Sequence, residues 1–542
     1  MERIQISLVS VVKHDGEVVW WSQPGGQPLD TTYSVPVVAE INGTRMFITG
    51  VADGSVVALK IGTGEKIWQF RLTKRGINVS PVVHNNRVYI GHSEENLDNT
   101  VMGRVVCIDA TGTGDVTDTH EVWRVDGLKV GYASPALYEG RLYVIENKGL
   151  MHCLDADTGK EHWKFRTGRA AKGSPVIADG KMYLTEVNAR FLILKLNDDG
   201  CELLDEEKFS DPDFGAIDMF GSPAISNGRI YLAAMHGVYC IGAKEPSVSA
   251  TITPLGKPQN APPGAKPATL AVYPAEVLLA AGSRQVFKAR VFDDRGRYIK
   301  DVKPLWISSV PAIKVSPVGA ASTPADSAGA IGFVMARFDG LEAMARIRVV
   351  PNLPFEQDFT DIAAGEAVAH WIGGGPPKFV VADLDGEMVL KKIARPDRKF
   401  MRSNIYMAAP GQTGYTIQAD MAGTTKRRKL PDMGLIANRY RFELMGNLQQ
   451  MRLITWVAMR RVESKIKFEW QADRWYTLKM RVDVNGASAT VRGKVWPRGE
   501  SEPSAWTIEL VDPLGNTEGS PGLYGYAMAD IYYDNVRVWQ ND

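Results

Sequence analysis

The chain has 542 residues, of which 44% are hydrophobic and 23% charged, and its formal net charge is +1. This length exceeds the roughly 250–300 residues that a single core supports, so we expect about three domains. Lysine and arginine are scattered along the chain and no apolar run reaches the ~20 residues of a membrane span, so we expect neither nucleic-acid binding nor a membrane span.

The N-terminal stretch, MERIQISLVSVVKHDGEVVWW, has a short apolar run followed by charges and paired tryptophans. It contains no small-residue cleavage site of the kind that ends a signal peptide. We therefore interpret it as folded strand.

A unit of four short strands recurs along residues 25–243. Its first strand carries a Ser/Val-Pro signature, which appears as YSVPVV, NVSPVV, YASPAL, KGSPVI and FGSPAI. A polar turn, a second strand and a third strand follow, and a fourth strand carries an aromatic residue, as in EKIWQF, HEVWRV and KEHWKF. Four antiparallel strands that repeat every ~40–55 residues are typical of propeller blades. The pattern predicts four complete blades and three strands of a fifth.

The tryptophans of the fourth strands are expected to pack each blade against its neighbour. They are Trp20, Trp68, Trp123 and Trp163. The segment around Trp20 fits two arrangements. It is either a lone fourth strand that completes the fifth blade and closes the ring, or strands three and four of an earlier blade.

The repeats resemble those of the quinoprotein-like, or pyrroloquinoline quinone (PQQ) type, propeller family. The family motif Asp-x-x-Thr-Gly-x-x-x-Trp is matched within Leu154 to Trp163 and in part by Lys60 to Trp68. Family members usually have seven or eight blades and an export signal. The resemblance thus implies a periplasmic or extracellular protein and a sequence that lacks N-terminal blades.

Two further all-β modules are expected after the propeller of residues 1–243. Residues 244–267 are rich in Pro, Ala and Gly and predict a linker. Residues 268–351 alternate in the manner of a small sandwich and resemble bacterial immunoglobulin-like domains through Pro274, Gly282, Phe287, Asp293, Gly296 and Trp306. Residues 352–542 continue as strands without helices, and the segments DRWYTLKMRV and YYDNVRVW resemble the concanavalin A/laminin G-like jelly-roll sandwich family.

The four cysteines do not predict a disulfide framework. Cys107, Cys153 and Cys240 occupy the same position of the third strand, where Ala58 stands in the first blade. Equivalent positions on neighbouring blades are too far apart for the ~4.4–6.8 Å Cα separation of a disulfide. We expect these cysteines to be small core residues.

The resemblance raises the question of a bound quinone. In a propeller, the loops that enter the first and third strands converge on the axis, where cations could hold a tricarboxylate and Glu with Asn could bind Ca²⁺. The candidate funnel residues are Lys74, Arg75, Asn78, Lys129, Arg169, Lys172, Glu186 and Asn188. Alcohol dehydrogenases of this family stack the quinone on a disulfide between adjacent cysteines, and no two cysteines here are adjacent. We therefore expect no PQQ.

The insertion HSEENLDNTVMG offers Glu94, Glu95, Asn96 and Asp98 as candidate Ca²⁺ ligands. It lacks the ligand spacing and the glycine of an EF-hand loop. A solvated polar loop is the preferred interpretation, and we expect no other metal.

Glycosidase chemistry in the C-terminal module would require two facing carboxylates. The nearest string, EQDFTD from Glu356 to Asp361, departs from the Glu-x-Asp-x-x-Glu pattern of jelly-roll glucanases, so no catalytic residues are predicted. Aromatic residues that could stack on sugar rings are Trp456, Trp475, Trp496 and Trp506.

The leading hypothesis is a non-enzymatic, monomeric scaffold of the bacterial cell envelope. Its propeller would dock other envelope proteins and its C-terminal sandwich could bind polysaccharide. The alternative is an enzyme, either a PQQ-dependent dehydrogenase or a carbohydrate-active sandwich.

Overall fold

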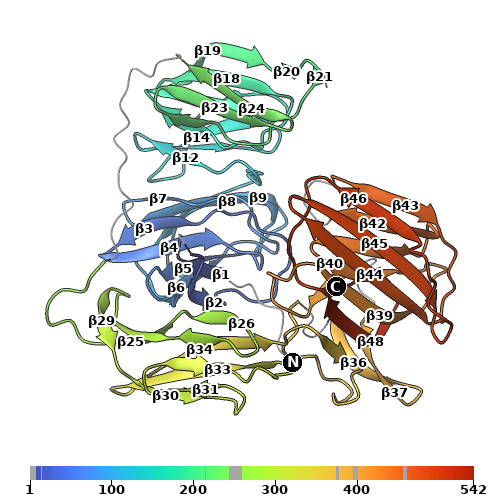
Figure 1. Cartoon of the computed structure of the whole chain (residues 1–542). Coiled ribbons are helices and arrows are strands. Elements are labelled where there is room, and N and C mark those ends of the chain that lie inside the picture. Colours follow the sequence, from blue (N-terminus) through green and yellow to red (C-terminus); the bar gives the residue numbers. More distant parts are fainter. Residues whose placement is uncertain are drawn as a thin grey trace. The chain divides into compact units, whose positions relative to one another are not determined.

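The computed structural model describes residues 8–13, 15–213, 215–242, 259–373, 378–394, 401–455 and 461–542. These residues form β-strands and no helix, so the prediction of an all-β protein is confirmed for them (Figure 1). Accordingly, none of the described segments is a helix long and apolar enough to cross a membrane. The chain divides into two compact units, one mainly of residues up to 271 with 290–302 and the other of residues 272–289 with 303–542.

The first four blades of the propeller each contain four antiparallel strands that follow one another along the chain. Blade 1 consists of β3 (Val37–Ile41), β4 (Thr44–Gly50), β5 (Ser55–Lys60) and β6 (Lys66–Arg71). Blade 2 consists of β7 (Val82–His84), β8 (Arg87–Glu95), β9 (Met102–Asp109) and β11 (Glu121–Asp126). Blade 3 consists of β12 (Ala136–Tyr138), β13 (Arg141–Ile145), β14 (Leu150–Asp155) and β15 (Glu161–Arg166). Blade 4 consists of β16 (Val176–Ala178), β17 (Lys181–Thr185), β18 (Arg190–Leu196) and β19 (Cys201–Lys208).

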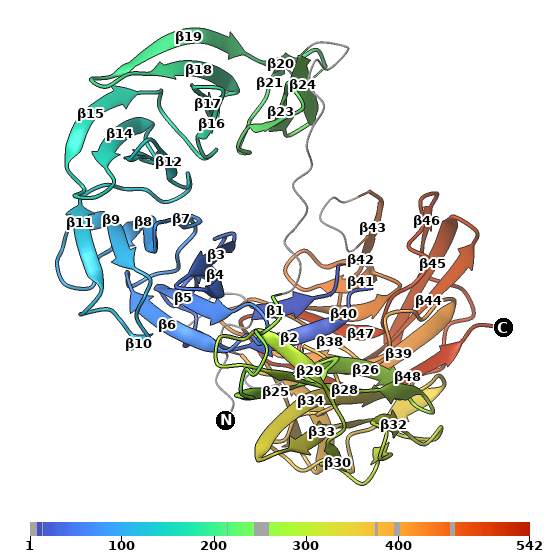
Figure 2. The ribbon, with the colours of Figure 1, turned by 90° about the vertical axis from the view of Figure 1, so that its left-hand side faces the viewer.

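The fifth blade has three strands, β22 (Ala224–Ser226), β23 (Arg229–Ala234) and β24 (Gly237–Gly242). Short strands also occur at β10 (Gly114–Asp115), which pairs with β6, and at β20 (Ser210–Asp211) with β21 (Gly215–Ala216). The blades follow one another in an arc (Figure 2). Within each blade the strands pair in chain order, as the four-strand repeat predicted, and of the described strands only β10, between β9 and β11, pairs with another blade.

Local turn chemistry explains the regular hairpins between the first and second strands. Two successive residues with positive φ stand at every such turn, namely Asn42–Gly43, Asn85–Asn86, Glu139–Gly140, Asp179–Gly180 and Asn227–Gly228. A two-residue hairpin of type I′ requires this conformation, which Asn, Asp and Gly adopt at low cost. The polar turns of the repeat thus fix the pairing of the strands beside them.

The N-terminal residues form a separate two-stranded sheet. β1 (Leu8–Val11) pairs antiparallel with β2 (Val18–Ser22). Trp20 of β2 is buried, and its Nε1 donates a hydrogen bond to the carbonyl of Ile61, in the β5–β6 turn of blade 1. The structure therefore shows the second of the two arrangements considered, strands three and four placed before blade 1.

Residues 269–350 form three small sheets. One contains β25 (Thr269–Tyr273), β28 (Lys288–Phe292) and β29 (Tyr298–Val302). Another has the order β26 (Glu276–Ala280), β34 (Leu341–Val350), β33 (Ala330–Phe338) and β30 (Leu305–Ser308). The third contains β27 (Arg284–Val286), β32 (Ala320–Ser322) and β31 (Lys314–Val315). Residues 244–258 of the predicted linker lie outside the described residues.

The C-terminal part is a sandwich of two antiparallel sheets around one core. The larger sheet has the order β36 (Phe379–Leu384), β37 (Glu387–Lys392), β48 (Ile531–Gln540), β39 (Tyr415–Gly423), β44 (Tyr476–Asn485), β45 (Ser488–Pro497) and β46 (Ile508–Asp512), with β35 (Phe355–Gln357) paired to β48. The smaller sheet has the order β38 (Met401–Tyr406), β47 (Gly522–Ala527), β40 (Asp432–Ala437), β41 (Tyr440–Met445), β42 (Gln450–Thr455) and β43 (Glu463–Lys467). Alternate residues of both sheets, such as Ile417 and Phe442, meet in the core, as the period of two of a half-buried strand requires.

Candidate docking site at the propeller mouth

The Ser/Val-Pro signature of each blade ends a four-residue segment, here called its tetrad: YSVP, NVSP, YASP, KGSP and FGSP. One cavity of the propeller is lined by the tetrads of all five successive blades. It has a volume of about 720 Å³, within the ~300–1,000 Å³ range of ligand pockets. Its lining consists of the first and third residues of each tetrad. We call these residues the mouth ring: Tyr33, Val35, Asn78, Ser80, Tyr132, Ser134, Lys172, Ser174, Phe220 and Ser222. The second residues of blades 2 and 3, Val79 and Ala133, are buried, because successive side chains of an extended segment point in opposite directions.

Serine hydroxyls connect the blades along the mouth ring. Ser80 Oγ accepts a hydrogen bond from the backbone N–H of Val35 at 2.9 Å, and Ser134 Oγ accepts one from the N–H of Ser80 at 2.9 Å. In the same way, the N–H of Ser134 donates to Ser174 Oγ at 2.9 Å. The N–H of Ser174 donates to Ser222 Oγ at 2.8 Å. Each serine thus satisfies a backbone donor of the preceding blade, which gives the repeated serine a structural role.

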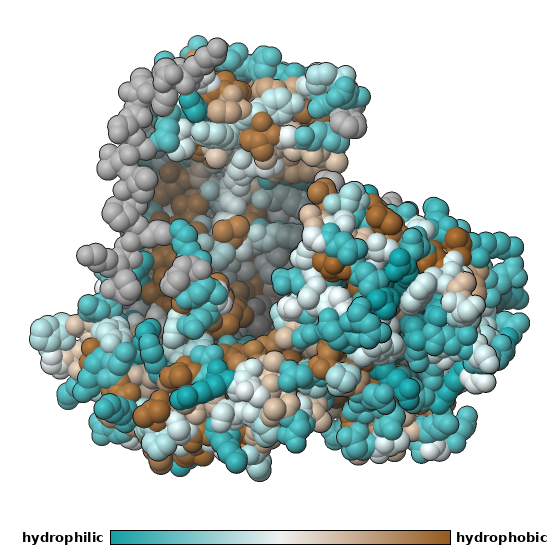
Figure 3. Space-filling view, viewed as in Figure 1, coloured by the Kyte–Doolittle hydropathy of each residue, from teal (hydrophilic) through white to brown (hydrophobic). Residues whose placement is uncertain are grey.

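Apolar side chains stand exposed at the same ring. The exposed fractions are 70% for Tyr33, 65% for Val35, 48% for Tyr132 and 44% for Phe220. Lys172 Nζ lies 5.4 Å from the ring centroid of Tyr132 and 4.4 Å from that of Phe220. Brown, apolar side chains are visible in the hollow over β7 and β12 (Figure 3). Large exposed aromatic residues beside a cation are typical of surfaces that bind a partner.

The structure brings only two of the predicted funnel residues, Asn78 and Lys172, to this cavity. Arg75 instead forms an ion pair with Glu95, at 3.2 Å between Nε and Oε2. Glu186 is buried and accepts a hydrogen bond from Arg190 at 2.8 Å. Burial raises the pKa of the Glu186 carboxyl above its ordinary value, against the opposing effect of Arg190. The remaining candidates, Lys74, Lys129, Arg169 and Asn188, do not line the cavity.

The mouth ring does not fit PQQ with Ca²⁺. A tricarboxylate requires several cations, whereas Lys172 is the only cationic side chain in the lining. The lining contains no carboxylate to hold Ca²⁺. The four cysteines are free thiols, so no disulfide offers a stacking surface.

Sequence analysis missed the aromatic members of the mouth ring. The predicted funnel residues are charged or amide side chains of the loops, and none of them is aromatic. The signal that could have identified these residues is the first position of each tetrad, which carries Tyr, Asn, Tyr, Lys and Phe in successive blades. That position recurs once per blade, so its side chains meet at the axis.

The loop proposed for Ca²⁺ is instead held by arginine. Asp98 forms ion pairs with Arg104, at 2.6 Å, and with Arg124. Burial alone would raise the pKa of Asp98, but hydrogen bonds from the two arginines outweigh it and hold the pKa below its ordinary value. Asn96 is buried and donates to Asn99 at 3.0 Å. Within the described residues, no group of His, Cys, Asp or Glu has the arrangement of a metal site.

The fourth-strand tryptophans lie between successive blades. Trp68 Nε1 donates to the carbonyl of Ala110 at 3.1 Å, and Trp123 Nε1 donates to that of Ala156 at 3.0 Å. Both acceptors belong to the turn between the third and fourth strands of the next blade. Trp163 Nε1 is buried and has no acceptor among the described residues. The blade that follows Trp163 has lost the Asp-x-x-Thr-Gly turn, so the usual carbonyl is not presented.

The expectation that the third-strand cysteines are all core residues is wrong for Cys240. Cys107 and Cys153 are fully buried, and burial raises the pKa of the Cys107 thiol to about 12. Cys240 is exposed, as is its neighbour Val238 at 71%. The reason is that the equivalent face of the earlier blades is covered by the next blade, whereas the described residues supply no blade after the fifth.

The tryptophans proposed for sugar stacking have cations of the same chain against their rings. Arg498 lies 5.1 Å from the centroid of Trp475. Lys494 lies 4.8 Å from that of Trp506. Trp496 is buried, and Trp456 lies outside the described residues. A sugar that stacked on Trp475 or Trp506 would have to displace a cation or use the opposite face.

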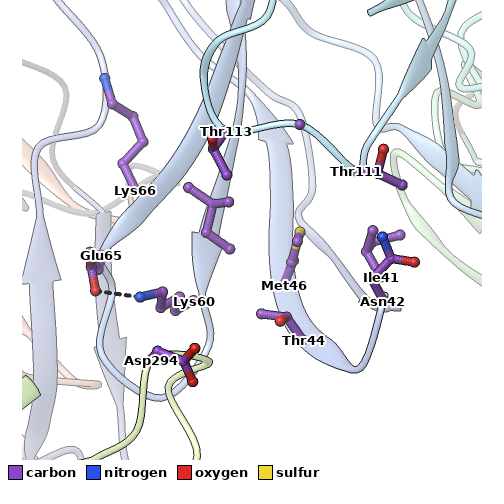
Figure 4. Close-up of a pocket in the computed structure, with 12 residues that line it drawn as sticks. Ile41, Asn42, Thr44, Met46, Lys60, Glu65, Lys66, Thr111, Thr113 and Asp294 are labelled. Carbon is purple, nitrogen blue, oxygen red and sulfur yellow. Dashed lines mark hydrogen bonds and ion pairs between the residues drawn. The ribbon is translucent and has the colours of Figure 1, made fainter. Parts of the chain in front are cut away.

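A second cavity of about 350 Å³ lies beside blade 1 (Figure 4). Of its four charged lining residues, Lys60, Glu65 and Lys66 are engaged with other groups of the chain. Lys60 Nζ forms an ion pair with Glu65 at 2.8 Å, and Lys66 Nζ donates to the carbonyl of Pro24 at 3.0 Å. Three of the four charged groups of this cavity are therefore already paired, whereas the one charged group of the mouth ring, Lys172, forms no ion pair with a described residue.

The N-terminal part of the chain matches a known family of repeats. Residues 5–121 and 101–234 match the family model described as outer membrane protein assembly factor BamB. Proteins of that name are 23% identical over 186 residues in Yersinia pestis and 25% identical over 182 residues in Escherichia coli (strain K12). These alignments cover 34% and 32% of this chain, and 44% and 42% of the relatives. The chain thus spans less than half the length of the relatives it matches.

Solved structures similar to this one include BamB from Moraxella catarrhalis, with a TM-score of 0.34 and 17% identity over 43% of this chain and 66% of that chain. Sqt1 of Saccharomyces cerevisiae has a TM-score of 0.33 and 12% identity over 55% of this chain and 78% of that chain. The family match and the repeated four-stranded blades together show that the N-terminal part of the chain is a propeller of PQQ-like repeats.

Proposed function

We propose that this protein is a non-enzymatic docking scaffold of the bacterial cell envelope whose propeller binds proteins of outer membrane protein assembly. The observation that carries the proposal is the family match over residues 5–234, since the matched family and the curated relatives are named as outer membrane protein assembly factors. The mouth ring supports it, because a rigid ring with exposed Tyr33, Tyr132 and Phe220 suits the binding of another protein.

Polysaccharide binding by the C-terminal sandwich remains a prediction. Lys494 and Arg498 disfavour sugar stacking on the ring faces of Trp506 and Trp475 that they cover.

The proposal is tested in a bacterium that encodes the full chain. An epitope-tagged copy is crosslinked in intact cells, purified from the solubilised envelope and analysed by quantitative mass spectrometry. We expect enrichment of outer membrane assembly proteins over a tagged periplasmic protein of unrelated fold. Deletion of the gene should lower the amount of folded outer membrane proteins. Absence of both effects would refute the proposed function.

A further inference from the structure

We propose that the mouth ring binds an extended peptide segment of a partner protein, with an acidic side chain at Lys172 and apolar side chains against Tyr132 and Phe220. This inference rests on the proposed docking function and gives it a site and a ligand chemistry. It concerns three successive blades, because Tyr132 lies at the start of blade 3, Lys172 at the start of blade 4 and Phe220 at the start of blade 5.

Charge complementarity indicates an anionic group. Lys172 is the one cation of the mouth ring, and the ring contains no acidic side chain. Within the described residues Lys172 contacts the two aromatic rings and forms no ion pair. A carboxylate could therefore approach Lys172 without displacing an existing partner. An acidic residue flanked by apolar ones would satisfy the ammonium group and both rings together.

The serines of the ring favour an extended backbone as the occupant. The Oγ atoms of Ser134, Ser174 and Ser222 accept backbone N–H groups, so their hydroxyl hydrogens point elsewhere. These O–H groups donate to no acceptor in the described part of the chain. A peptide lying across blades 3 to 5 would offer carbonyl acceptors to them while its side chains reach the aromatic rings. The cavity of about 720 Å³ has room for a few residues.

The test uses the full-length protein and the fluorescein-labelled, amide-capped peptide Gly-Leu-Phe-Glu-Phe-Leu-Gly, with a second peptide in which Gln replaces Glu. Binding is measured by fluorescence anisotropy. We expect saturable binding of the Glu peptide and about tenfold weaker binding of the Gln peptide, as for the loss of one charge pair. Lys172→Gln should weaken binding of the Glu peptide about tenfold and leave the affinity for the Gln peptide unchanged.

Two further variants separate the rings from the charge. Tyr132→Ala and Phe220→Ala should each weaken binding of the two peptides by a similar factor, because each substitution removes apolar contact area. Lys164→Gln, at an exposed position of β15 away from the mouth ring, is the matched control and should change neither affinity. Circular dichroism of all variants checks that the fold is kept.

Three outcomes of the peptide assay would overturn the inference. The first is no saturable binding of the Glu peptide up to about 1 mM. The second is an equal effect of Lys172→Gln on both peptides. The third is displacement of the peptide by PQQ with Ca²⁺, or by laminarin oligosaccharides at the same ring, which would assign the ring to a small acid or to a sugar. If tagged Lys172→Gln protein still enriches outer membrane assembly proteins as wild type does, the docking function stands and the site proposed here is wrong.

Discussion

The hydrogen bond between neighbouring blades allows a matched comparison of two tryptophans. Trp123 and Trp163 are each 8% exposed. Each lies beside a tyrosine of its own blade, with ring centroids 6.0 Å apart for Trp123 and 5.9 Å apart for Trp163. They differ in one respect, because Trp123 Nε1 donates to the carbonyl of Ala156 and Trp163 Nε1 has no acceptor among the described residues.

Replacement of each tryptophan by phenylalanine removes a similar volume from the core. Trp123→Phe also deletes the hydrogen bond and leaves the carbonyl of Ala156, a residue only 5% exposed, without this donor. A hydrogen bond contributes about 0.5–1.5 kcal/mol, and an unsatisfied buried group costs about 1–3 kcal/mol. Trp163→Phe removes an indole N–H that is already unsatisfied. We therefore expect Trp123→Phe to lower the free energy of opening by about 1–2 kcal/mol more than Trp163→Phe does.

The assay is amide hydrogen exchange of the full-length protein at several urea concentrations, followed for peptides from β9, β14 and β15. Local opening energies are preferable because a chain of several domains does not unfold in one two-state step. Trp475→Phe in the sandwich is the control and should leave exchange in the propeller unchanged. An equal or larger effect of Trp163→Phe would refute the role given to the interblade hydrogen bond.

Three further predictions concern charge and exposure. Arg104→Met should lower the free energy of opening of blade 2 by about 3 kcal/mol, measured by hydrogen exchange of peptides from β9 and β11, because it leaves the partly buried Asp126 carboxylate without its arginine partner. The hydrogen bond from Arg104 is the main cause of the lowered pKa of Asp126. The stability difference between wild type and Arg104→Met should therefore shrink as the pH falls below about 3.9, where the carboxylate becomes protonated in the unfolded chain. A stability difference that does not change with pH would contradict this. Burial lowers the pKa of Lys392 to about 8, so the folded protein loses this proton at a lower pH than the unfolded chain does. The stability of the wild-type protein should therefore rise between pH 8 and about 10.4. Lys392→Met should lack this rise and should be more stable than wild type at pH 7 by about 3 kcal/mol. An unchanged urea midpoint at pH 7 would contradict the unpaired burial of this lysine. Maleimide labelling of native protein, mapped by mass spectrometry, should modify exposed Cys240 well before buried Cys107, and equal rates would show that the blade cores open readily.

The blades could be predicted because their signals are local. The polar turns, the alternation of the strands and the Ser/Val-Pro tetrads each act within a few residues, and they predicted four full blades and three strands of a fifth. Trp20 illustrates the limit of this reasoning. Its strand fitted two arrangements, and only the pairing of β1 with β2 and the hydrogen bond to Ile61 in the structure distinguished them.

The candidate site was accessible to sequence analysis only in part. Asn78 and Lys172 were among the predicted funnel residues, but Tyr132 and Phe220 were missed. Asp98 was a candidate Ca²⁺ ligand, whereas in the structure its carboxylate forms ion pairs with Arg104 and Arg124.

Sequence by itself therefore determined the strands, the turns and the repeat, because these depend on contacts between near neighbours in the chain. Tertiary structure decided which residue of each tetrad faces the axis, which charges pair across strands and which cysteine is left exposed. These features depend on how one blade stacks on the next, so groups separated by ~40–50 residues meet there. The mouth ring exists only as the sum of five blades, and no single repeat contains it.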